Sequence, residues 1–523
     1  ATFLANGDLN GSNSFMALHL APGFQYRFRH GKTTTIVPGG TLDASGSSCS
    51  NYITLISLSS GNQAFINTSG ANLAVQFVTL MDMAVMGGGV ISAANSIDLG
   101  NNTGWNVTPP PSRTLYWVGG GGNWNDVLHW SLSSGGANGA CIPSAFDDVF
   151  FDQNSGFVSA GEAVSVNIET AYCRDMTWIN VANTPEFKVS SASNKLYVYG
   201  SLALAPGMIL NFDGEIHMRS TSTGETFFSA GKTFIKVVYF EGVGGEWTLL
   251  DNFTSSNRLN HTTGIFRTGG NTVIVSGFTS GGDALYLGSS ILNVTQTNFS
   301  LGSLTLLDAG TSHVTVSGGN LSGYPSHTFY NVTMGGFGTV SNINVSNKIT
   351  FQGLGIYEGQ SGCTINEVEF QQKGTIDGSG AFFSTATFLA NGDLNGSNSF
   401  MALNLAPGFL YRFQKGKTST IAAGGTLNAS GSGCNNYITL SSGSAGNQAF
   451  LNTSGANLAL QYVTLMDMAV TGGGVISAAN SIDLGNNTGW NITPPASRAL
   501  YWVGGGGNWD DVSHWSLTSG GAG

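Results

Sequence analysis

Tryptophans recur in two short clusters of the sequence, at Trp117, Trp124 and Trp130 and again at Trp502, Trp509 and Trp515. Exposed indole rings stack on the faces of sugars, so one interpretation is a glycan-stacking platform. In the other interpretation, the rings bury a large apolar area and close the end of a β-structure. We favour the end-cap interpretation and keep glycan stacking as the alternative.

Acidic side chains could bind calcium, which prefers carboxylate and carbonyl oxygens. The candidate ligands are Asp147, Asp148 and Asp152, and residues 6–11 (NGDLNG) resemble the start of a calcium-binding loop. The bidentate acid expected at the twelfth position of such a loop is absent, because Ala17 stands there. The alternative is that these side chains bond to their own backbone in Asx turns. We therefore expect no cofactor and keep calcium as a secondary hypothesis.

The five cysteines show neither CxxC nor zinc-finger spacing, which argues against a structural metal. Cys141 and Cys173 are 32 residues apart, a spacing that suits a disulfide between neighbouring coils in an oxidising compartment. We predict that disulfide. Cys363 and Cys434 are predicted to be buried single thiols, since free cysteine is among the most buried residue types.

Catalysis requires ionisable groups in fixed positions, and the duplicated part of the chain does not keep them. His19 and Asp43 of the first copy are replaced by Asn404 and Asn428 in the second. The chain also contains no GxSxG or HExxH motif. We therefore predict that the protein is not an enzyme. Residues 139–385 occur only once, so the comparison of copies does not test them.

The residues discussed so far belong to a repeated unit. Residues 1–138 return at 386–523 with a constant offset of 385, and 24 of the 138 paired positions differ. Proline clusters at 108–112 (TPPPS) and 493–497 (TPPAS) cannot donate to a β-ladder, and they stiffen a linker. The sequence therefore predicts the C-terminal part of one repeat at 1–112, one complete repeat at 113–497, and the start of the next repeat at 498–523.

Composition limits the classes of partner. Charged residues make up 9% of the chain, against about 25% in an ordinary domain. The net charge of −11 includes no basic run, so nucleic acid is not an expected partner. No apolar run approaches the ~18 residues of a membrane span, so no membrane-spanning segment is expected. Hydrophobic residues at 41% are too frequent for a disordered chain.

Short runs that alternate polar and apolar residues recur between glycine-rich turns, which is the pattern of half-buried strands. Examples are 195–199, 271–275, 303–306, 313–316, 331–334, 348–351 and 436–440. We find no helical periodicity, so the predicted fold class is all-β. A period of 385 residues is long for a β-sandwich of ~100 residues. It favours a parallel β-helix (a β-solenoid) of about 20–25 residues per coil.

An ordered series of motifs runs through the predicted repeat. These motifs are RTLYWVGGGGNWNDVLHW (113–130), DDVFFD (147–152), CRDMTW (173–178), GGEWTL (244–249) and SIDLGNNTGW (96–105). The series resembles the giant repetitive secreted and cell-surface proteins of Bacteroidota, including gliding-motility adhesins of the SprB type, over essentially the whole chain. The resemblance implies export by the type IX secretion system and an extracellular or cell-surface location. It identifies no ligand.

These features predict a structural and adhesive tandem-repeat protein that forms a long extracellular fibre or cell-surface filament and serves surface attachment or gliding motility. The expected partners are neighbouring repeats of the same polypeptide, other copies in a fibre, and a surface or polysaccharide ligand. A carbohydrate-binding repeat array is the alternative hypothesis, because repetition raises avidity. A polysaccharide lyase or hydrolase is the less favoured hypothesis.

Overall fold

The chain is built almost wholly from β-structure. The computed structural model describes residues 1–49, 51–59 and 61–523. These residues form short strands and two 3-10 helices of three residues each, η1 (Val127–His129) and η2 (Val512–His514), and no α-helix. Across these described ranges, no helix is long and apolar enough to cross a membrane. The all-β prediction is confirmed.

The chain comprises two compact units. Unit 1 contains Ala1–Ser290 and Ser303–Leu306, and unit 2 contains Ile291–Gly302 and Leu307–Gly523. In each unit nearly every ladder joins parallel strands of successive turns, which is the parallel β-solenoid predicted from the sequence. The division between the units lies inside the predicted 113–497 repeat. A compact unit and a sequence repeat are therefore different segments of this chain.

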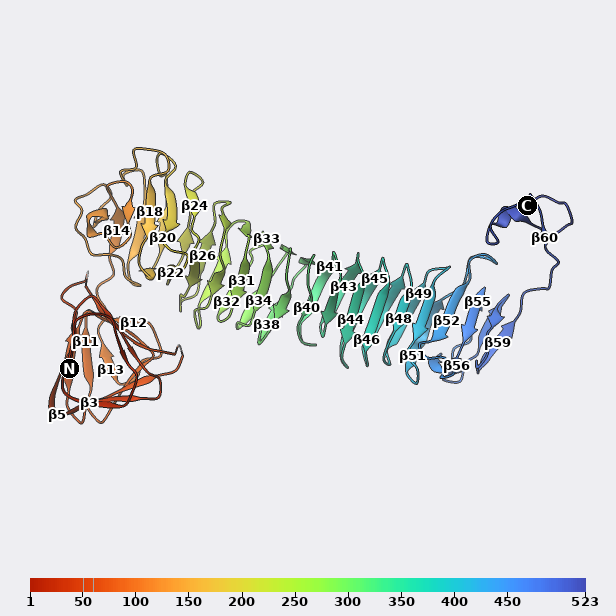
Figure 1. Ribbon diagram of the computed structural model, residues 1–523, viewed down its shortest axis with the longest axis horizontal. Coiled ribbons are helices and arrows are strands. Elements are labelled where there is room, and N and C mark those ends of the chain that lie inside the picture. Colours follow the sequence, from red (N-terminus) through yellow and green to blue (C-terminus); the bar gives the residue numbers. More distant parts are fainter. Residues whose placement is uncertain (50, 60) are drawn as a thin grey trace. The chain divides into compact units, whose positions relative to one another are not determined.

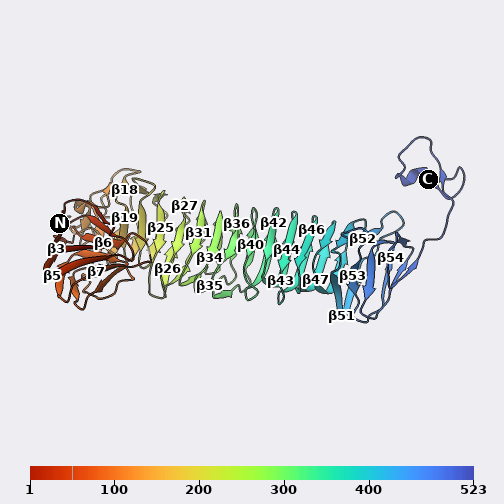
Figure 2. The same cartoon turned by 60° about the horizontal axis from the view of Figure 1, so that its bottom comes forward.

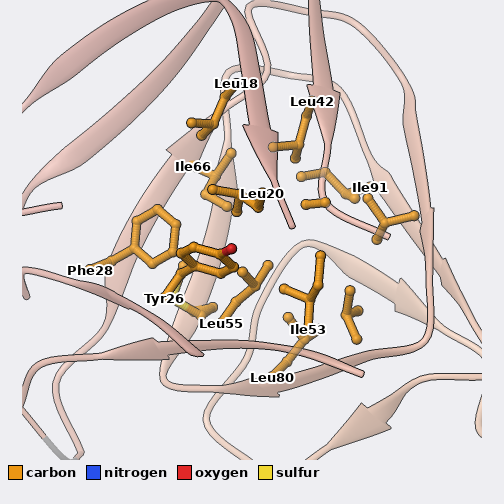
Figure 3. Close-up of a cluster of buried hydrophobic side chains, with 14 of the residues drawn as sticks. Leu18, Leu20, Tyr26, Phe28, Leu42, Ile53, Leu55, Ile66, Leu80 and Ile91 are labelled. Carbon is orange, nitrogen blue, oxygen red and sulfur yellow. The ribbon is translucent and has the colours of Figure 1, made fainter. Parts of the chain in front are cut away.

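The first strands of unit 1 surround an apolar core. They begin at β1 (Thr2–Phe3), end at β13 (Trp105–Val107) and form three parallel sheets. Figure 3 shows the core side chains of this segment, with Tyr26 and Phe28 among leucines and isoleucines from the facing strands. The Tyr26 ring is fully buried, and its hydroxyl donates a hydrogen bond to the Ala21 carbonyl.

From residue 113 onward, unit 1 has three strands in most turns. One sheet carries the candidate site, and its strands follow the order β19 (Thr170–Cys173), β22 (Lys195–Val198), β25 (Glu215–Met218), β28 (Val238–Phe240), β31 (Arg258–His261) and β34 (Gly277–Ser280). A second sheet includes β14 (Thr114–Trp117), β17 (Asp148–Phe151), β20 (Met176–Trp178), β23 (Leu202–Ala203), β26 (Glu225–Phe228), β29 (Glu246–Leu249), β32 (Ile265–Arg267) and β35 (Ala284–Tyr286). Paired residues in the first sheet are 19 to 25 apart.

Between residues 338 and 413 of unit 2 the turns are shorter. One sheet stacks β42 (Gly338–Ser341), β44 (Gly355–Gly359), β46 (Gly374–Gly378), β48 (Gly392–Leu394) and β50 (Leu410–Phe413). A second sheet stacks β41 (Thr328–Met334), β43 (Asn344–Phe351), β45 (Thr364–Phe370), β47 (Phe382–Phe388), β49 (Ser399–Leu405) and β51 (Thr418–Asn428) (Figures 1 and 2). Paired residues in the first of these sheets are 17 to 19 apart. The coil length predicted from the sequence is therefore too long for these turns, because each of them has two strands.

The predicted strands are found with one exception. β39 (His313–Val316) matches the predicted run residue for residue. The other predicted runs overlap β22, β33 (Thr272–Val275), β41, β43 and β52 (Ile438–Ser442). The prediction at 303–306 is wrong, because β38 (Leu306–Asp308) begins only at its last residue. Leu304 is buried while lying outside any strand, so its apolar character did not mark a strand.

The β-ladders stop at both proline clusters. Within the described residues, no ladder pairs a strand before residue 108 with one after residue 112. Similarly, no ladder joins β59 (Trp490–Thr493) to β60 (Tyr501–Trp502) in that part of the chain. Proline has no amide hydrogen to donate, which accounts for the break. The breaks coincide with the repeat boundaries expected at 112/113 and 497/498.

Candidate functional site on strands β22, β25 and β28

Three neighbouring strands of unit 1 present aromatic and charged side chains on their outer surface. Along each strand the inward-facing residues are buried in the core, and the residues between them face outward. The parallel register brings Lys195 opposite Glu215, and it brings Tyr197, His217 and Tyr239 into one line. Side chains from successive turns, well separated in sequence, therefore meet on the surface.

Four rings form what we call the aromatic column: Tyr172, Tyr197, His217 and Tyr239. The His217 ring is stacked on Tyr239, with 4.4 Å between ring centroids and an interplanar angle of 6°. On its other side, the Tyr197 centroid is 4.6 Å away. Tyr172 meets Tyr197 edge-on at 5.8 Å, and the Arg219 guanidinium lies 5.0 Å above the Tyr197 ring. The column runs along four successive turns, and Tyr172, Tyr197 and Tyr239 are partly exposed, whereas His217 is buried between its neighbours.

A network of ion pairs crosses the same strands. Glu215 Oε2 lies 2.9 Å from Lys195 Nζ and 3.3 Å from His217 Nε2. His217 Nδ1 is 2.8 Å from Glu241 Oε1, and that oxygen is 3.4 Å from Arg219 Nε. His217 thus lies between two carboxylates, and each carboxylate also has a cationic partner. Both glutamates are occupied by protein groups.

The pKa values in this network follow from burial and from the paired charges. Burial acts to raise the pKa of Glu215, but hydrogen bonds and charges from Lys195 and His217 outweigh it, and the pKa is lowered. The hydrogen bond to Glu215 raises the pKa of Lys195. Burial raises the pKa of Tyr239, and the charge of Glu215 adds to the effect. At neutral pH Glu215 is therefore ionised and Tyr239 is neutral.

A cavity of about 550 Å³ borders the aromatic column. Tyr172, Tyr197 and Lys195 line it together with Asn51 and Tyr52, all within unit 1. Ligand sites commonly have volumes of about 300–1,000 Å³. Phenol rings beside amide and ammonium groups suit a ligand rich in hydroxyl groups, such as a sugar.

Comparisons with protein-family models and with curated proteins find no match to this chain.

The predicted tryptophan cluster forms the first layer of the solenoid that begins at residue 113. Trp117, Trp124 and Trp130 are fully buried, and β14 pairs antiparallel with β16 (Trp130–Ser131). The Trp130 ring meets both other indoles at about 5 Å, and all three rings contact Phe151. Fully buried rings offer no face to a sugar. Their position is that of an end cap.

The second tryptophan cluster keeps the local geometry without the burial. Trp502 stacks on His514 with centroids 4.8 Å apart, as Trp117 stacks on His129 at 4.7 Å. However, Trp502 is 40% exposed and Trp509 is 78% exposed, and Trp515 is half-buried. Local sequence alone therefore produces the cluster, and the following turns produce its burial.

The predicted calcium ligands bind protein donors instead: Asp147 binds Arg113, Asp148 binds Arg174, and Asp152 accepts from the Asn154 amide. The Asp147 pair is bidentate, with Nε–Oδ1 at 2.8 Å and Nη2–Oδ2 at 2.6 Å. In the segment 6–11, Asp8 binds Arg27. Among the described residues, no group of three or more His, Cys, Asp or Glu side chains is placed to hold a metal ion. The geometry assigns these carboxylates to ion pairs and an Asx turn.

The predicted Cys141–Cys173 disulfide is wrong. Cys141 is bonded to Cys49, and Cys173 is a free thiol at the inward-facing end of β19. Burial raises the pKa of the Cys173 thiol well above its ordinary value. The prediction assumed that both cysteines lay on stacked coils, whereas Cys141 lies in the loop before β17. Cys363 is buried and free as predicted, but Cys434 is exposed.

The residues of the aromatic column were not predicted from the sequence. The alternating run at 195–199 predicts a strand, but it does not predict the register that brings Tyr197 beside His217. A signal was present, because KLYVY at 195–199 and EIHMR at 215–219 both carry aromatic and charged residues at alternate positions. Turn lengths vary in this segment, so no fixed offset identified the pair.

Proposed function

We propose that this chain is part of an extracellular structural and adhesive tandem-repeat protein. The single observation that carries the proposal is that each turn is stabilised by stacking on the next, in both copies of the repeated segment. In such a solenoid, stability adds up between nearest neighbours, so the number of turns can grow without redesign of a core. Length is what a fibre or a filament needs.

The two copies support this proposal at the level of single contacts. Asp82 accepts a hydrogen bond from Asn101 at 2.6 Å, and Asp467 accepts from Asn486 at the same distance. The contacts that recur join one turn to the next. Repetition has therefore kept stacking contacts, as a structural role requires.

The Cys49–Cys141 disulfide supports an extracellular location, because such bonds persist in oxidising compartments. The resemblance to the repetitive surface proteins of Bacteroidota points the same way and adds type IX export and gliding motility to the proposal. The test is antibody labelling of intact cells of the source organism, before and after treatment with an external protease. Labelling that protease removes is the expected result. Labelling that appears only after cell lysis would overturn the surface location.

Adhesion is tested separately with beads coated with the chain. We expect coated beads to be retained on the natural attachment surface under flow, several-fold more than beads coated with an unrelated solenoid of similar charge. Equal retention of both beads would remove the adhesive part of the proposal and leave the structural part.

The aromatic column and its cavity favour polysaccharide binding as the second candidate function. Tyr197 and Tyr239 flank His217 and offer ring surfaces beside charged hydrogen-bonding groups. We expect Tyr197→Ala with Tyr239→Ala to reduce binding on a glycan array at least tenfold. Tyr330→Ala, at an outward-facing tyrosine of unit 2, is the matched control and should retain binding. Absence of binding by the parent chain on the array would contradict polysaccharide binding as a function of this site.

We infer that the site is not catalytic. Glycoside hydrolysis needs a carboxyl group that stays protonated until it gives up its proton, and such groups have raised pKa values. Glu215 has a lowered pKa, and both glutamates are held by cationic partners. Release of products from a polysaccharide panel, lost on Glu215→Gln, would contradict the inference.

A further inference from the structure

We infer that Cys434 forms a disulfide with a cysteine of the following repeat, so that each proline junction carries one covalent staple. The inference rests on the proposed tandem array. It assigns a bonding partner to a thiol that is exposed and free in this chain.

The junction at residues 108–112 provides the precedent. Cys49 lies before it and Cys141 after it, with 5.7 Å between their Cα atoms and a sequence separation of 92. That Cα distance lies inside the usual range for disulfides, about 4.4–6.8 Å. Within the described residues no β-ladder crosses this junction. The disulfide is the one covalent link across it there besides the backbone.

Cys434 occupies the position of Cys49 in the second copy, 385 residues later. The loops around the two cysteines have the same hydrogen bonds. The Asn51 amide donates to Ser47 Oγ at 2.9 Å, and the Asn436 amide donates to Ser432 Oγ at 2.9 Å. The second loop therefore holds its thiol as the first loop holds a bonded sulfur.

A second observation shows where the partner would come from. Arg498 Nη1 lies 3.8 Å from Cys434 Sγ. Arg498 is the counterpart of Arg113, which opens the first turn of a repeat and binds Asp147, six residues beyond Cys141. The start of the next repeat thus already contacts the free thiol. By the same offset, the counterpart of Cys141 would follow Gly523 by three residues.

The bond forms by thiol–disulfide exchange with a low-molecular-weight disulfide such as oxidised glutathione. The thiolate of one cysteine attacks the external disulfide, which gives a mixed disulfide and releases one thiolate. The second cysteine thiolate then displaces the other. Two protein thiols are oxidised to one disulfide, the external disulfide is reduced to two thiols, and the two protons lost by the cysteines end on those two thiols.

The test extends the chain after Gly523 with a second copy of residues 139–290, which supplies the counterpart of Cys141. The original chain and the extended chain are each alkylated with iodoacetamide without reduction, and the modified cysteines are mapped by mass spectrometry. In the original chain we expect rapid alkylation of Cys434 alone, because Cys173 and Cys363 are buried. In the extended chain we expect a cross-linked peptide that contains Cys434 and a loss of at least nine-tenths of its alkylation.

Two outcomes would overturn the inference. One is undiminished alkylation of Cys434 in the extended chain, and the other is rapid alkylation of Cys49 or Cys141 without reductant. In the extended Cys434→Ser variant, the appended cysteine should become the reactive thiol. Hydrogen exchange at residues 499–516 serves as the independent measure of repeat assembly. If these residues become protected from exchange while Cys434 stays reactive, the result supports the tandem array and contradicts the proposed Cys434 disulfide.

Discussion

One residue pair that meets across turns changes in both members between the two copies. His19 Nδ1 lies 2.6 Å from Asp43 Oδ2, on the neighbouring strands β3 (Asn13–Leu20) and β5 (Thr33–Asp43). In the second copy the same positions hold Asn404 and Asn428, and the Asn428 amide donates to Asn404 Oδ1 at 2.7 Å. The charges are lost and the contact is kept. An asparagine pair thus keeps a hydrogen bond along the axis without charge, as like polar side chains do in other stacked β-structures.

One buried histidine makes the fold sensitive to acid. His261 is fully buried, its Nε2 donates to the Gly264 carbonyl at 2.9 Å, and its Nδ1 accepts from Ser280 Oγ at 2.9 Å. Burial lowers the pKa of His261 below its ordinary value of about 6.5. The unfolded chain therefore binds a proton more readily than the folded chain, and stability falls as the pH drops below about 6.5.

The measurement is the melting temperature between pH 7.5 and 5. We expect His261→Gln, which keeps an amide donor without a titrating ring, to show a smaller fall than the parent. His30→Gln is the matched control, because His30 is exposed. An identical pH dependence in the parent and in His261→Gln would contradict this assignment.

At the scale of elements, the turns of unit 2 depend on glycines that face aromatic rings. Phe351, Phe370 and Phe388 stack on successive turns, with centroids 4.8 and 4.6 Å apart. Gly355 and Gly374 pair across the neighbouring sheet, and a Cβ at either would come within 2.2 Å of the phenylalanine four residues earlier. The aromatic ring occupies the space that a side chain would take.

We expect Gly374→Ala to destabilise unit 2 by about 1–3 kcal/mol, the usual cost of overpacking a filled core. The reason is the 2.2 Å approach of the new Cβ to Phe370 Cγ. Gly433→Ala is the control, because nothing lies within 4 Å of its added Cβ. Urea unfolding followed by circular dichroism measures both variants. Equal midpoints would show that the phenylalanine column can move aside.

The end cap depends on one glycine in the same way. A Cβ at Gly122 would lie 2.0 Å from His129 Nε2, and His129 is the ring on which Trp117 stacks. We expect Gly122→Ala to raise the hydrogen-exchange rate of residues 114–131 at least tenfold. Residues 499–516 of the same molecule carry the same motif with three substitutions, keep the glycine and the histidine, and act as the internal control. Unchanged exchange at 114–131 would show that the cap tolerates displacement of His129.

Sequence patterns predicted the class of fold because the alternation of polar and apolar residues is local and the 385-residue repeat can be read directly from the sequence. The stacked phenylalanines could also be predicted from the sequence, because Phe351, Phe370 and Phe388 each precede a glycine by four residues, once in every turn. The aromatic column could not be predicted from the sequence, because the offset from Tyr197 to its neighbours depends on turn lengths that differ from one turn to the next. The disulfide partner of Cys141 could not be predicted from the sequence either, because it depends on how the chain folds at the proline junction.

At the scale of the whole molecule, the proline junctions separate segments that are linked by covalent bonds and not by ladders. We expect a proline-specific protease to cut at residues 109–111. Without reductant, the two products should migrate as one band, because Cys49–Cys141 still joins them. With reductant they should separate, and far-UV circular dichroism should stay unchanged.

The same digestion contains its own control. Cutting at residues 494–495 should release the C-terminal fragment with or without reductant, because Cys434 is free in this chain. A Cys49→Ser variant should release the N-terminal fragment under both conditions. Release of that fragment from the parent chain without reductant would show that the junction is not bonded.

The disulfide also decides how this chain would respond to a pulling force. Tension applied at the two ends passes through the Cys49–Cys141 bond, so the residues between them lie outside the load path. At about 3.4 Å per extended residue, the sequence separation of 92 corresponds to about 300 Å of chain that cannot be drawn out until the bond is reduced. Reduction would add this hidden length in one step. A cell that attached itself through such repeats could therefore set their extensibility through the redox state of its surroundings.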